Sequence, residues 1–222
     1  MIPPGAAIRV VGDVHGDTAG FAYALATDRF VIQLGDLVDG GDDSAATLRM
    51  AIEMERAGRG VFLLGNHDLK LLRALSGRKV AIGPELSRTL EQLDLDLRAD
   101  AMAALAWAPA WLASGNAFFV HGGFHPAMLH QAPPAPVPLG NADGLLGRAM
   151  FGQATGRTRP DGYPERVLDW VADIPRGLTC YVGHDIRSTD GRPWTCANKS
   201  GGAAVFLDTG AGKGGHLSWI DL

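Results

Sequence analysis

The feature that most constrains the fold of this chain is a series of short apolar runs, each of which ends in a turn rich in glycine, aspartate and histidine. The runs are Ile8 to Val11, Phe30 to Leu34, Val61 to Leu64, Phe118 to Val120, Tyr181 to Val182 and Ala204 to Leu207. Short runs of β-branched and aromatic residues that are bounded by turn residues are typical of buried strands. We therefore predict a sheet protein in which polar side chains gather at the ends of the strands.

Between the first strands, the apolar residues change to a helical spacing. Asp43 or Ser44 can cap the N-terminus of a helix that carries Leu48 and Ile52. A second helix is predicted in the leucine-rich stretch after "GNHD", and it ends at Gly77. Strands that alternate with helices predict an α/β fold, in which functional sites lie beyond the carboxyl ends of the strands. We expect the whole chain, residues 1–222, to form a single domain.

Composition narrows the classes of function. Hydrophobic residues make up 46% of the chain and charged residues 20%, which indicates a folded protein, and the formal net charge of −4 provides no basic surface for long nucleic acid. No apolar run approaches the roughly 18 residues of a membrane-spanning helix, and the N-terminus lacks a signal-peptide pattern. Cys180 and Cys196 match no zinc-binding or redox spacing. We expect a cytoplasmic protein with reduced thiols, without membrane contact and without an obligate partner.

The turns that follow the apolar runs contain residues suited to metal binding. These residues are Asp13, His15, Asp36, Asn66, His121 and His184. Imidazoles combined with oxygen ligands, without thiolate, suit Mn, Fe or Zn. Two such ions about 3.5–4 Å apart are a common device for hydrolysing phosphate esters, and one carboxylate can bridge both. The sequence therefore predicts a site for two divalent metal ions, and manganese is the favoured metal.

The motifs "GDVHG", "GDLVDGG", "GNHD", "VHGG" and "VGHD" resemble the signature of the calcineurin-like metallophosphoesterases, in particular their phosphoprotein phosphatase branch. The stretches "LGNHDLKLLRALSGRKV", "LSRTLEQL", "AMFGQATGRTRPDGYPERVLDWV" and "VFLDTGAGKGGHLSWIDL" look most like the phosphatase module of bacterial polynucleotide kinase-phosphatase. Symmetrical diadenosine tetraphosphatases are the next relatives. The resemblance implies a sandwich of central mixed β-sheets flanked by helices.

The resemblance also implies which residues hold the metals. Asp13, His15 and Asp36 hold the first ion in this interpretation, and Asp36, Asn66, His121 and His184 hold the second, with Asp36 as the bridge. A water molecule activated by both metals attacks phosphorus in line, without a covalent enzyme intermediate. This set of ligands agrees with the chemistry that the residue types themselves indicate.

The same resemblance implies roles for residues next to the predicted ligands. His67 would act as the general acid toward the leaving-group oxygen, and Asp39 would orient and charge it. The alternative for Asp39 is a carboxylate that caps its own turn. Asp68 is expected to stabilise the start of a helix, and Asp208 is expected to support a ligand histidine. His125, His130 and His216 match no ligand position, so we expect them to be structural or exposed.

One residue departs from the resembled pattern. The position after the second aspartate of "GDLVDGG" is an arginine in that pattern, where its planar side chain can bind two phosphate oxygens at once, but here it is Gly40. Either another arginine binds the phosphate, with Arg148 and Arg157 as candidates, or the substrate differs from that of the arginine-bearing relatives. Both hypotheses are open at the level of the sequence.

The predicted activity is metal-dependent hydrolysis of a phosphomonoester, with a nucleotide-like molecule or a nucleic-acid end as the substrate. A phosphoprotein or diadenosine tetraphosphate is the alternative substrate, and a module that binds phosphorylated ligands with little turnover is the alternative function. We expect residues 124–178 to cover the site and select the substrate. The stretch "GAGKGG", residues 210–215, lacks the spacing of a kinase phosphate loop, and we expect a stand-alone phosphatase.

Overall fold

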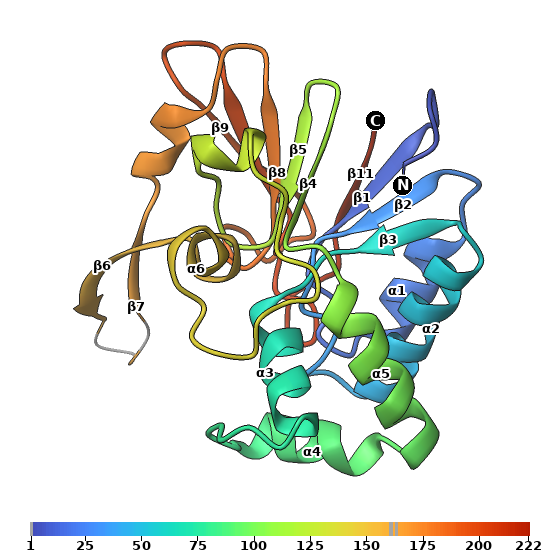
Figure 1. Ribbon diagram of the computed structural model, residues 1–222. Coiled ribbons are helices and arrows are strands. Elements are labelled where there is room, and N and C mark those ends of the chain that lie inside the picture. Colours follow the sequence, from blue (N-terminus) through green and yellow to red (C-terminus); the bar gives the residue numbers. More distant parts are fainter. Residues whose placement is uncertain (1, 160–161, 163) are drawn as a thin grey trace.

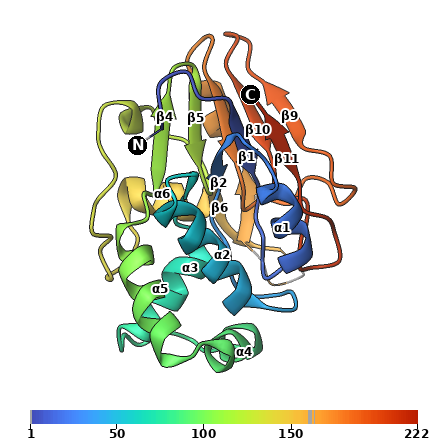
Figure 2. The same cartoon turned by 90° about the vertical axis from the view of Figure 1, so that its right-hand side faces the viewer.

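A computed structural model describes residues 2–159, 162 and 164–222 of the chain (Figure 1). Within these residues, the central strands form two sheets that pack face to face, and helices cover their outer sides (Figures 1 and 2). The predicted α/β architecture of central sheets flanked by helices is confirmed. No helix in this part of the chain is both long enough and apolar enough to span a bilayer.

The first sheet has the strand order β11, β1, β2, β3. The strands are β1 (Ile8–Val11), β2 (Phe30–Gln33), β3 (Gly60–Phe62) and β11 (Trp219–Asp221). β1, β2 and β3 are parallel, and β11 pairs with β1 in the antiparallel direction. Helices α1 (Thr18–Leu25) and α2 (Ser44–Arg56) make the crossover connections that parallel neighbours require. The carboxyl ends of β1, β2 and β3 therefore lie at the same edge.

The second sheet has the order β4, β5, β8, β10, β9. Its strands are β4 (Trp111–Ser114), β5 (Ala117–Val120), β8 (Thr179–Val182), β9 (Trp194–Ala197) and β10 (Ala203–Phe206). β5, β8 and β10 are parallel, whereas β4 and β9 pair in the antiparallel direction at the two sides. All of the predicted strands are present, and their ends differ from the predicted ones by a few residues at most.

The remaining elements lie around the sheets. They are α3 (Asn66–Leu75), α4 (Pro84–Gln92), α5 (Leu95–Trp107), η1 (Pro126–Leu129), α6 (Gly144–Phe151), β6 (Gln153–Thr158), β7 (Pro164–Val167) and η2 (Asp169–Asp173). Asp43, not Ser44, caps α2, because its side chain accepts a hydrogen bond from the backbone N–H of Ala46 at 2.8 Å. Helix α3 stops just before Gly77, as predicted, and Gly77 has a φ of +69°.

The central strands are buried on both faces. Val10 and Ile32 belong to an apolar cluster between the two sheets, whereas their neighbours Val11 and Val31 pack into the cluster that includes the helices. This alternation follows from the two-residue period of a strand. Because apolar residues occupy most positions on both faces, the predicted metal ligands lie just beyond the strand ends.

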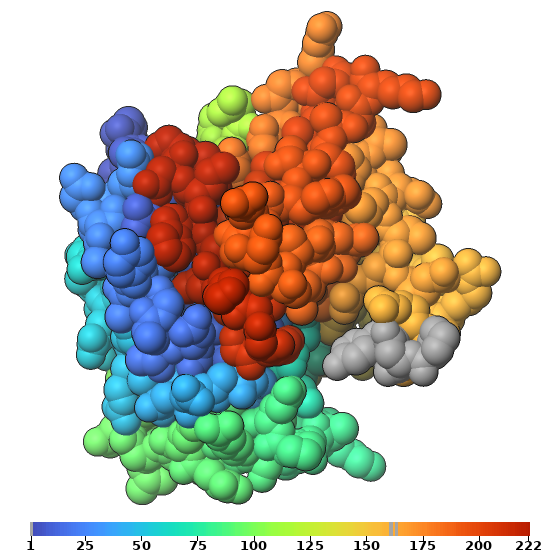
Figure 3. Space-filling model, turned by 180° about the vertical axis from the view of Figure 1, so that it is seen from behind, coloured from blue at the N-terminus to red at the C-terminus, as the bar shows by residue number. Residues whose placement is uncertain are grey.

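The last part of the chain joins the two sheets. β10 is in the second sheet and β11 pairs with β1 of the first, with Val11 opposite Trp219. Figure 3 shows the result, in which red C-terminal segments lie beside blue N-terminal segments on one face of the molecule. The connection between β10 and β11 therefore runs close to the loops that follow the strands of both sheets.

Candidate functional site

The loops at the carboxyl ends of the strands converge on a cleft of about 290 Å³. The predicted site residues that line it are His15, Asp36, Asn66, His67, His184 and Asp208. Asp13 and His121 lie next to them and are buried, at 1% and 0% exposure. Residues from the loops after β1, β2, β3, β5, β8 and β10 are thus brought together, although they are spread over nearly the whole sequence.

Backbone strain is concentrated at this site. Among the residues that the structure describes, those with positive φ other than glycine are His15, Asp36, Asp39 and His184, at 46°, 57°, 66° and 64°. This left-handed conformation is unfavourable for a residue with a Cβ atom and costs on the order of 1–3 kcal/mol. Such strain persists only where the surrounding fold enforces it, and it is common at functional sites. The strained loops hold these side chains toward the cleft.

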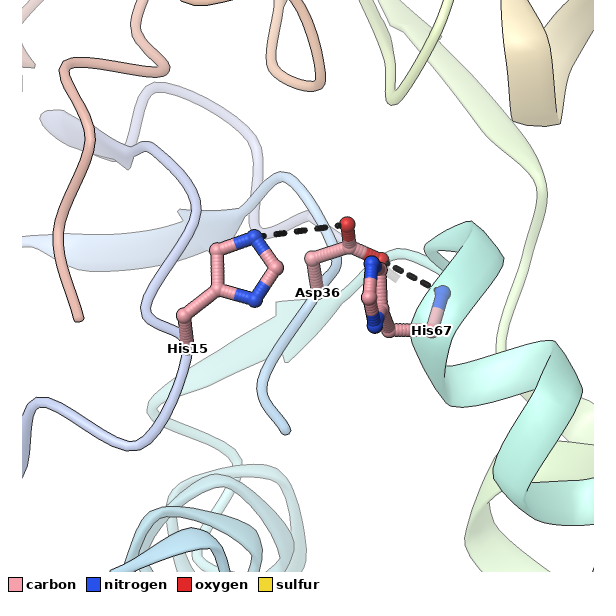
Figure 4. Close-up of side chains that lie close together, drawn as sticks. All are labelled: His15, Asp36 and His67. Atoms are coloured by element: carbon pink, nitrogen blue, oxygen red, sulfur yellow. Dashed lines mark hydrogen bonds and ion pairs between the residues drawn. The ribbon is translucent and has the colours of Figure 1, made fainter. Parts of the chain in front are cut away.

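Figure 4 shows His15, Asp36 and His67 pointing toward one another from the segments after three strands. His15 Nε2 lies 3.6 Å from Asp36 Oδ2 and 3.9 Å from Asp13 Oδ2. The Nδ1 atom of His15 lies 2.8 Å from the backbone oxygen of Asp39, so it carries the proton and donates it. Burial lowers the pKa of His15 to about 4, so the ring is neutral near pH 7. Its Nε2 therefore presents a lone pair to the carboxylates.

His121, Asn66 and His184 form a second group around Asp36. His121 Nδ1 donates to the backbone oxygen of Leu34 at 2.9 Å, so its Nε2 faces Asn66 Oδ1 at 3.0 Å and Asp36 Oδ2 at 3.4 Å with a lone pair. His184 Nε2 is buried, and among the described residues it has no hydrogen-bond partner. Burial holds the pKa of His184 well below its usual value, so the ring is neutral and one of its nitrogens has a lone pair.

The two groups fit divalent cations. One ligand atom from each of His15, Asp36 and His67 lies within 4.8 Å of the others, and the same holds for Asp36, His121 and His184. Lone pairs that face each other in a buried space are unfavourable unless a positive charge lies between them. Imidazole nitrogens with carboxylate and amide oxygens are common ligands of divalent transition metals. Asp36 belongs to both groups.

The buried carboxylates add a second reason for a cation. Burial raises the pKa of Asp13 well above its usual value, and the nearby charges of Asp208 and Asp36 raise it further. Burial also raises the pKa of Asp208. The positive charge of Lys213 acts in the opposite direction on both carboxyl groups. A divalent cation bound between these groups stabilises their ionised forms in the same way.

His67 has a different environment from the other histidines. Its Nδ1 lies 2.8 Å from Asp39 Oδ2, and Thr89 on α4 donates to Asp39 Oδ1 at 2.6 Å. Both oxygens of Asp39 thus bind side chains and not the backbone of its own turn. Burial by itself lowers the pKa of His67, but the charge of Asp36 and the hydrogen bond with Asp39 outweigh it, so the pKa is raised. The protonated ring is therefore favoured.

Thr89 was not identified from the sequence. It lies 50 positions after Asp39 on a separate helix, so no motif or spacing connects the two residues. Its side chain is buried, at 1% residue exposure, and it fixes the carboxylate that orients His67. A buried polar residue on the apolar face of α4 was the one available indication of such a role.

Asp68 does more than stabilise the start of α3. Its Oδ2 accepts from the backbone N–H of Gly65 at 3.0 Å, which is the expected helix-start contact, and also from that of Asp36 at 2.7 Å. Its Oδ1 accepts from the N–H of Leu37 at 3.0 Å. The side chain is fully buried. Asp68 therefore connects, through hydrogen bonds, the strained loop that carries Asp36 to helix α3, which carries Asn66 and His67.

We expect Asp68→Asn to lower the free energy of unfolding by about 2 kcal/mol, because the amide nitrogen cannot accept a hydrogen bond and leaves a buried N–H group unpaired. Urea unfolding of the parent and the variant measures the change. Asp96→Asn is the matched control, since Asp96 is an exposed acid in the first turn of α5; we expect it to stay within about 0.5 kcal/mol of the parent. Equal losses in both variants would contradict the linking role of Asp68.

The two arginines that were candidates for phosphate binding do not line the cleft. Arg148 Nη1 donates to Gln153 Oε1 at 3.0 Å, and Arg157 is exposed and pairs with Glu165 across the β6–β7 hairpin at 2.7 Å. These contacts hold both side chains at other positions, so the structure does not support either candidate. The positively charged residues of the described lining are Arg159, Arg166 and Lys213.

The other predicted residues lie as follows. Asp208 lines the cleft, and its Oδ1 accepts from the backbone N–H of Gly210 at 3.0 Å. Its expected support of a ligand histidine stays a prediction. His125 accepts a hydrogen bond from the backbone N–H of Ala127 at 3.1 Å, and His130 and His216 are exposed.

Comparison with known protein families identifies the family of the chain. The model of the calcineurin-like phosphoesterases matches residues 6–193. The chain is a calcineurin-like phosphoesterase. It is therefore a hydrolase that acts on phosphate esters, and the family predicted from the motifs is confirmed. The closer likeness to the phosphatase module of polynucleotide kinase-phosphatase stays a prediction.

Curated proteins similar to this phosphoesterase carry the name of tetraphosphatases. The asymmetrical bis(5'-nucleosyl)-tetraphosphatase PrpE of Halalkalibacterium halodurans is 26% identical over 234 residues, which cover 94% of this chain and 87% of that protein. The symmetrical bis(5'-nucleosyl)-tetraphosphatase of Paracidovorax citrulli is 34% identical over 165 residues, which cover 68% of this chain and 58% of that protein. The phosphoesterase is thus similar to proteins of both names.

Solved structures share the fold of this phosphoesterase. The crystal structure of a protein provisionally named a diadenosine tetraphosphatase matches with a TM-score of 0.69 and 21% identity. The match covers 100% of this chain and 91% of that protein's chain. A protein serine/threonine phosphatase from Saccharomyces cerevisiae has a TM-score of 0.61 and 14% identity, with coverage of 99% and 80%. At these identities the likeness shows the fold alone.

Proposed function

We propose that this phosphoesterase hydrolyses a phosphate group carried by a nucleotide, with two divalent metal ions and with His67 as the proton donor. One observation carries the proposal: Asp36 lies between two groups of imidazole nitrogens, and His67, which is hydrogen-bonded to the buried Asp39, lines the same cleft. A site that only binds phosphate does not need an oriented proton donor beside its metal ligands. The similar proteins named tetraphosphatases support the choice of a nucleotide.

The proposed ligands follow the two groups in the structure with one change: Asp13, whose Oδ2 lies 3.9 Å from His15 Nε2, replaces His67, which is hydrogen-bonded to Asp39. One ion would be held by Asp13, His15 and Asp36, and the other by Asp36, Asn66, His121 and His184, with manganese as the expected metal and iron or zinc as alternatives. When bound, the ions supply positive charge to the phosphate and lower the pKa of the attacking water. The chain itself fixes the direction of each ligand atom through the strained loops and through the hydrogen bonds at the Nδ1 atoms of His15 and His121.

His67 acts on the leaving group. As water adds to phosphorus and the bond between phosphorus and the leaving oxygen breaks, that oxygen gains negative charge and takes the proton of the imidazolium. Asp39 holds the ring through Nδ1, and Thr89 holds Asp39. The raised pKa of His67 keeps the donor protonated closer to neutral pH. Proton donation by His67 matters most when the leaving group is the anion of a weakly acidic hydroxyl.

Residues 124–178 are proposed to cover the substrate. Arg159 and Arg166 of the β6–β7 region line the cleft, and the ring centroid of Phe151 lies 6.4 Å from that of His184. Residues 160, 161 and 163 of this segment lie outside the described residues. Positively charged side chains at the rim suit a substrate with several phosphates, because charge-assisted hydrogen bonds to phosphate oxygens are strong.

Two classes of nucleotide substrate are consistent with the site. One is a phosphomonoester of a nucleotide or a nucleic-acid end, and the other is the bridging phosphate of a dinucleoside tetraphosphate. The names of the similar proteins and the cationic lining of the cleft favour the second class. The likeness to a serine/threonine phosphatase, at 14% identity, supports the shared fold and not a phosphoprotein substrate.

Reconstitution of the chelated protein tests the proposal. We expect chelation to lower turnover by at least about 100-fold, because the ions contribute several kcal/mol to transition-state stabilisation, and Mn²⁺ to restore it. The substrates are p-nitrophenyl phosphate, AMP, a 5'-phosphorylated oligonucleotide, a phosphopeptide and diadenosine tetraphosphate. We expect the last of these to have the highest kcat/KM. Its products, ADP alone or AMP with ATP, identify the bond that is cleaved.

Other outcomes of this experiment separate the alternatives. Preference for AMP or the oligonucleotide would favour a phosphomonoesterase, and preference for the phosphopeptide would contradict the nucleotide proposal. Binding of Mn²⁺ without turnover of any substrate would favour a module that binds phosphorylated ligands.

A further inference from the structure

The glycine-rich turn at residues 210–215 carries a lysine into the cleft. This segment follows Asp208 and belongs to the red C-terminal connection that lies beside the blue N-terminal segments in Figure 3. Lys213 lines the cleft, and its Nζ lies 2.9 Å from His15 Nε2. Because the Nδ1 atom of His15 already donates to backbone oxygens, the ammonium group of Lys213 is the donor in this contact.

Close packing of backbone determines where this turn lies. A Cβ atom at Gly212, which has a φ of +67°, would lie 2.2 Å from the backbone oxygen of His15 and 2.9 Å from the nitrogen of Gly41, so a larger residue does not fit. Hydrogen bonds from the N–H groups of Lys213 and Gly215 to the oxygen of Gly210, at 3.0 and 2.8 Å, fix the turn itself. Lys213 therefore projects from a rigid turn that rests directly on the metal-ligand loop.

The same packing explains Gly40. This residue has a φ of +118°, and a Cβ atom added to it would lie 3.2 Å from the backbone oxygen of Gly212 and 3.4 Å from Cβ of His15. A long side chain at this position would be strained and would meet the turn. The turn therefore lies where a side chain at position 40 would extend, and its Lys213 lines the cleft.

We propose that Lys213 binds the phosphate of the substrate and competes with a metal ion for His15 Nε2. The proposal rests on the proposed function, because it assumes that phosphate enters this cleft. An ammonium group and a metal ion cannot both use the same lone pair, so a bound ion excludes Lys213 from His15. Lys213 is an exposed residue of the cleft lining with a flexible side chain, so its freed ammonium group can turn to the phosphate oxygens, which are strong acceptors. Arg166 lies 3.9 Å from Asp185, whereas Lys213 contacts the ligand cluster itself.

Two binding measurements test this proposal, and the expected effects of Lys213→Ala have opposite signs. Calorimetric titration of the Mn²⁺-loaded protein with inorganic phosphate should show binding about tenfold weaker in Lys213→Ala than in the parent, as expected for a lost charge-assisted hydrogen bond. Titration of the chelated protein with Mn²⁺ should show binding about threefold or more tighter in the variant, because the competing ammonium group is gone. Lys213→Arg should keep phosphate binding within about threefold of the parent.

Lys199→Ala is the matched control, since it removes one lysine from an exposed turn between β9 and β10, outside the cleft lining. It should leave both affinities unchanged. Unchanged phosphate binding in Lys213→Ala, or a parent that does not bind phosphate, would overturn the proposal. Weaker binding of both phosphate and Mn²⁺ together with a lower Tm would also overturn it, because it would indicate a structural role. A parent that binds phosphate but hydrolyses no ester would refute the proposed function alone, since neither titration depends on turnover.

Discussion

A His67→Ala variant should lose about 100-fold to 10,000-fold in kcat on a phosphomonoester of a sugar hydroxyl such as AMP, which is the usual contribution of a general acid. The alkoxide that leaves from such an ester is a strong base and needs the proton. The loss should be much smaller on p-nitrophenyl phosphate, because nitrophenolate leaves readily without a proton, and on diadenosine tetraphosphate, whose leaving group is itself a phosphate. Steady-state kinetics on these substrates measures the difference.

The controls separate proton donation from other roles of His67. Asp39→Asn keeps the shape of the side chain that orients His67 but removes its charge. It should lower kcat less than His67→Ala does, and the loss should again be largest on AMP. His130→Ala changes an exposed histidine and should leave kcat unchanged. An equal loss for His67→Ala on every substrate would show that the residue positions the phosphate and does not donate a proton. The Mn²⁺ content of the variant should match that of the parent.

An Asp36→Asn variant should lose Mn²⁺ affinity at both sites, because Asp36 belongs to both groups of ligand atoms. The loss should exceed the roughly 10–100-fold that follows removal of a residue that only supports a metal ligand. Asparagine tolerates the positive φ of 57° at this position, so the loop should keep its conformation. Titration with Mn²⁺ measures the affinity, and turnover should fall with it.

Asp42→Asn is the control for this variant. Asp42 is an exposed residue in the same loop, and its replacement changes the net charge by the same amount. Full binding of Mn²⁺ by Asp36→Asn would contradict the shared-ligand assignment. Loss of affinity at one site only would show that Asp36 serves a single ion. The Tm of both variants, measured without metal, should stay close to that of the parent.

The strands and their polar ends could be predicted because the pattern that creates them is local. Runs such as Phe118 to Val120 are apolar throughout, which indicates burial on both faces, and His121 and Gly122 end the run at once. The family motifs added a prediction of which polar residues meet. The cap of α2 at Asp43 and the end of α3 before Gly77 were also local features.

The positions of the positively charged side chains around the cleft could not be predicted in the same way. Arg148 and Arg157 were chosen because they lie in the segment expected to cover the site, but their side chains are held by Gln153 and Glu165. The stretch "GAGKGG" was compared only with a kinase phosphate loop, whose spacing it lacks, and Lys213 was not considered. No local pattern could place Lys213, because its position depends on the packing of its turn against His15, which lies 198 positions away.

The sequence by itself determined the six strands that end at the site, the two helices after Asp43 and after "GNHD", and the chemical type of the site, because these depend on residues that are neighbours in the chain. The tertiary structure alone decided the positive φ values of His15, Asp36 and His184, the support of Asp39 by Thr89, and the position of Lys213. These features arise where segments distant in sequence pack together. Packing contacts of this kind can hold a strained backbone or a buried side chain in a conformation that no local pattern favours.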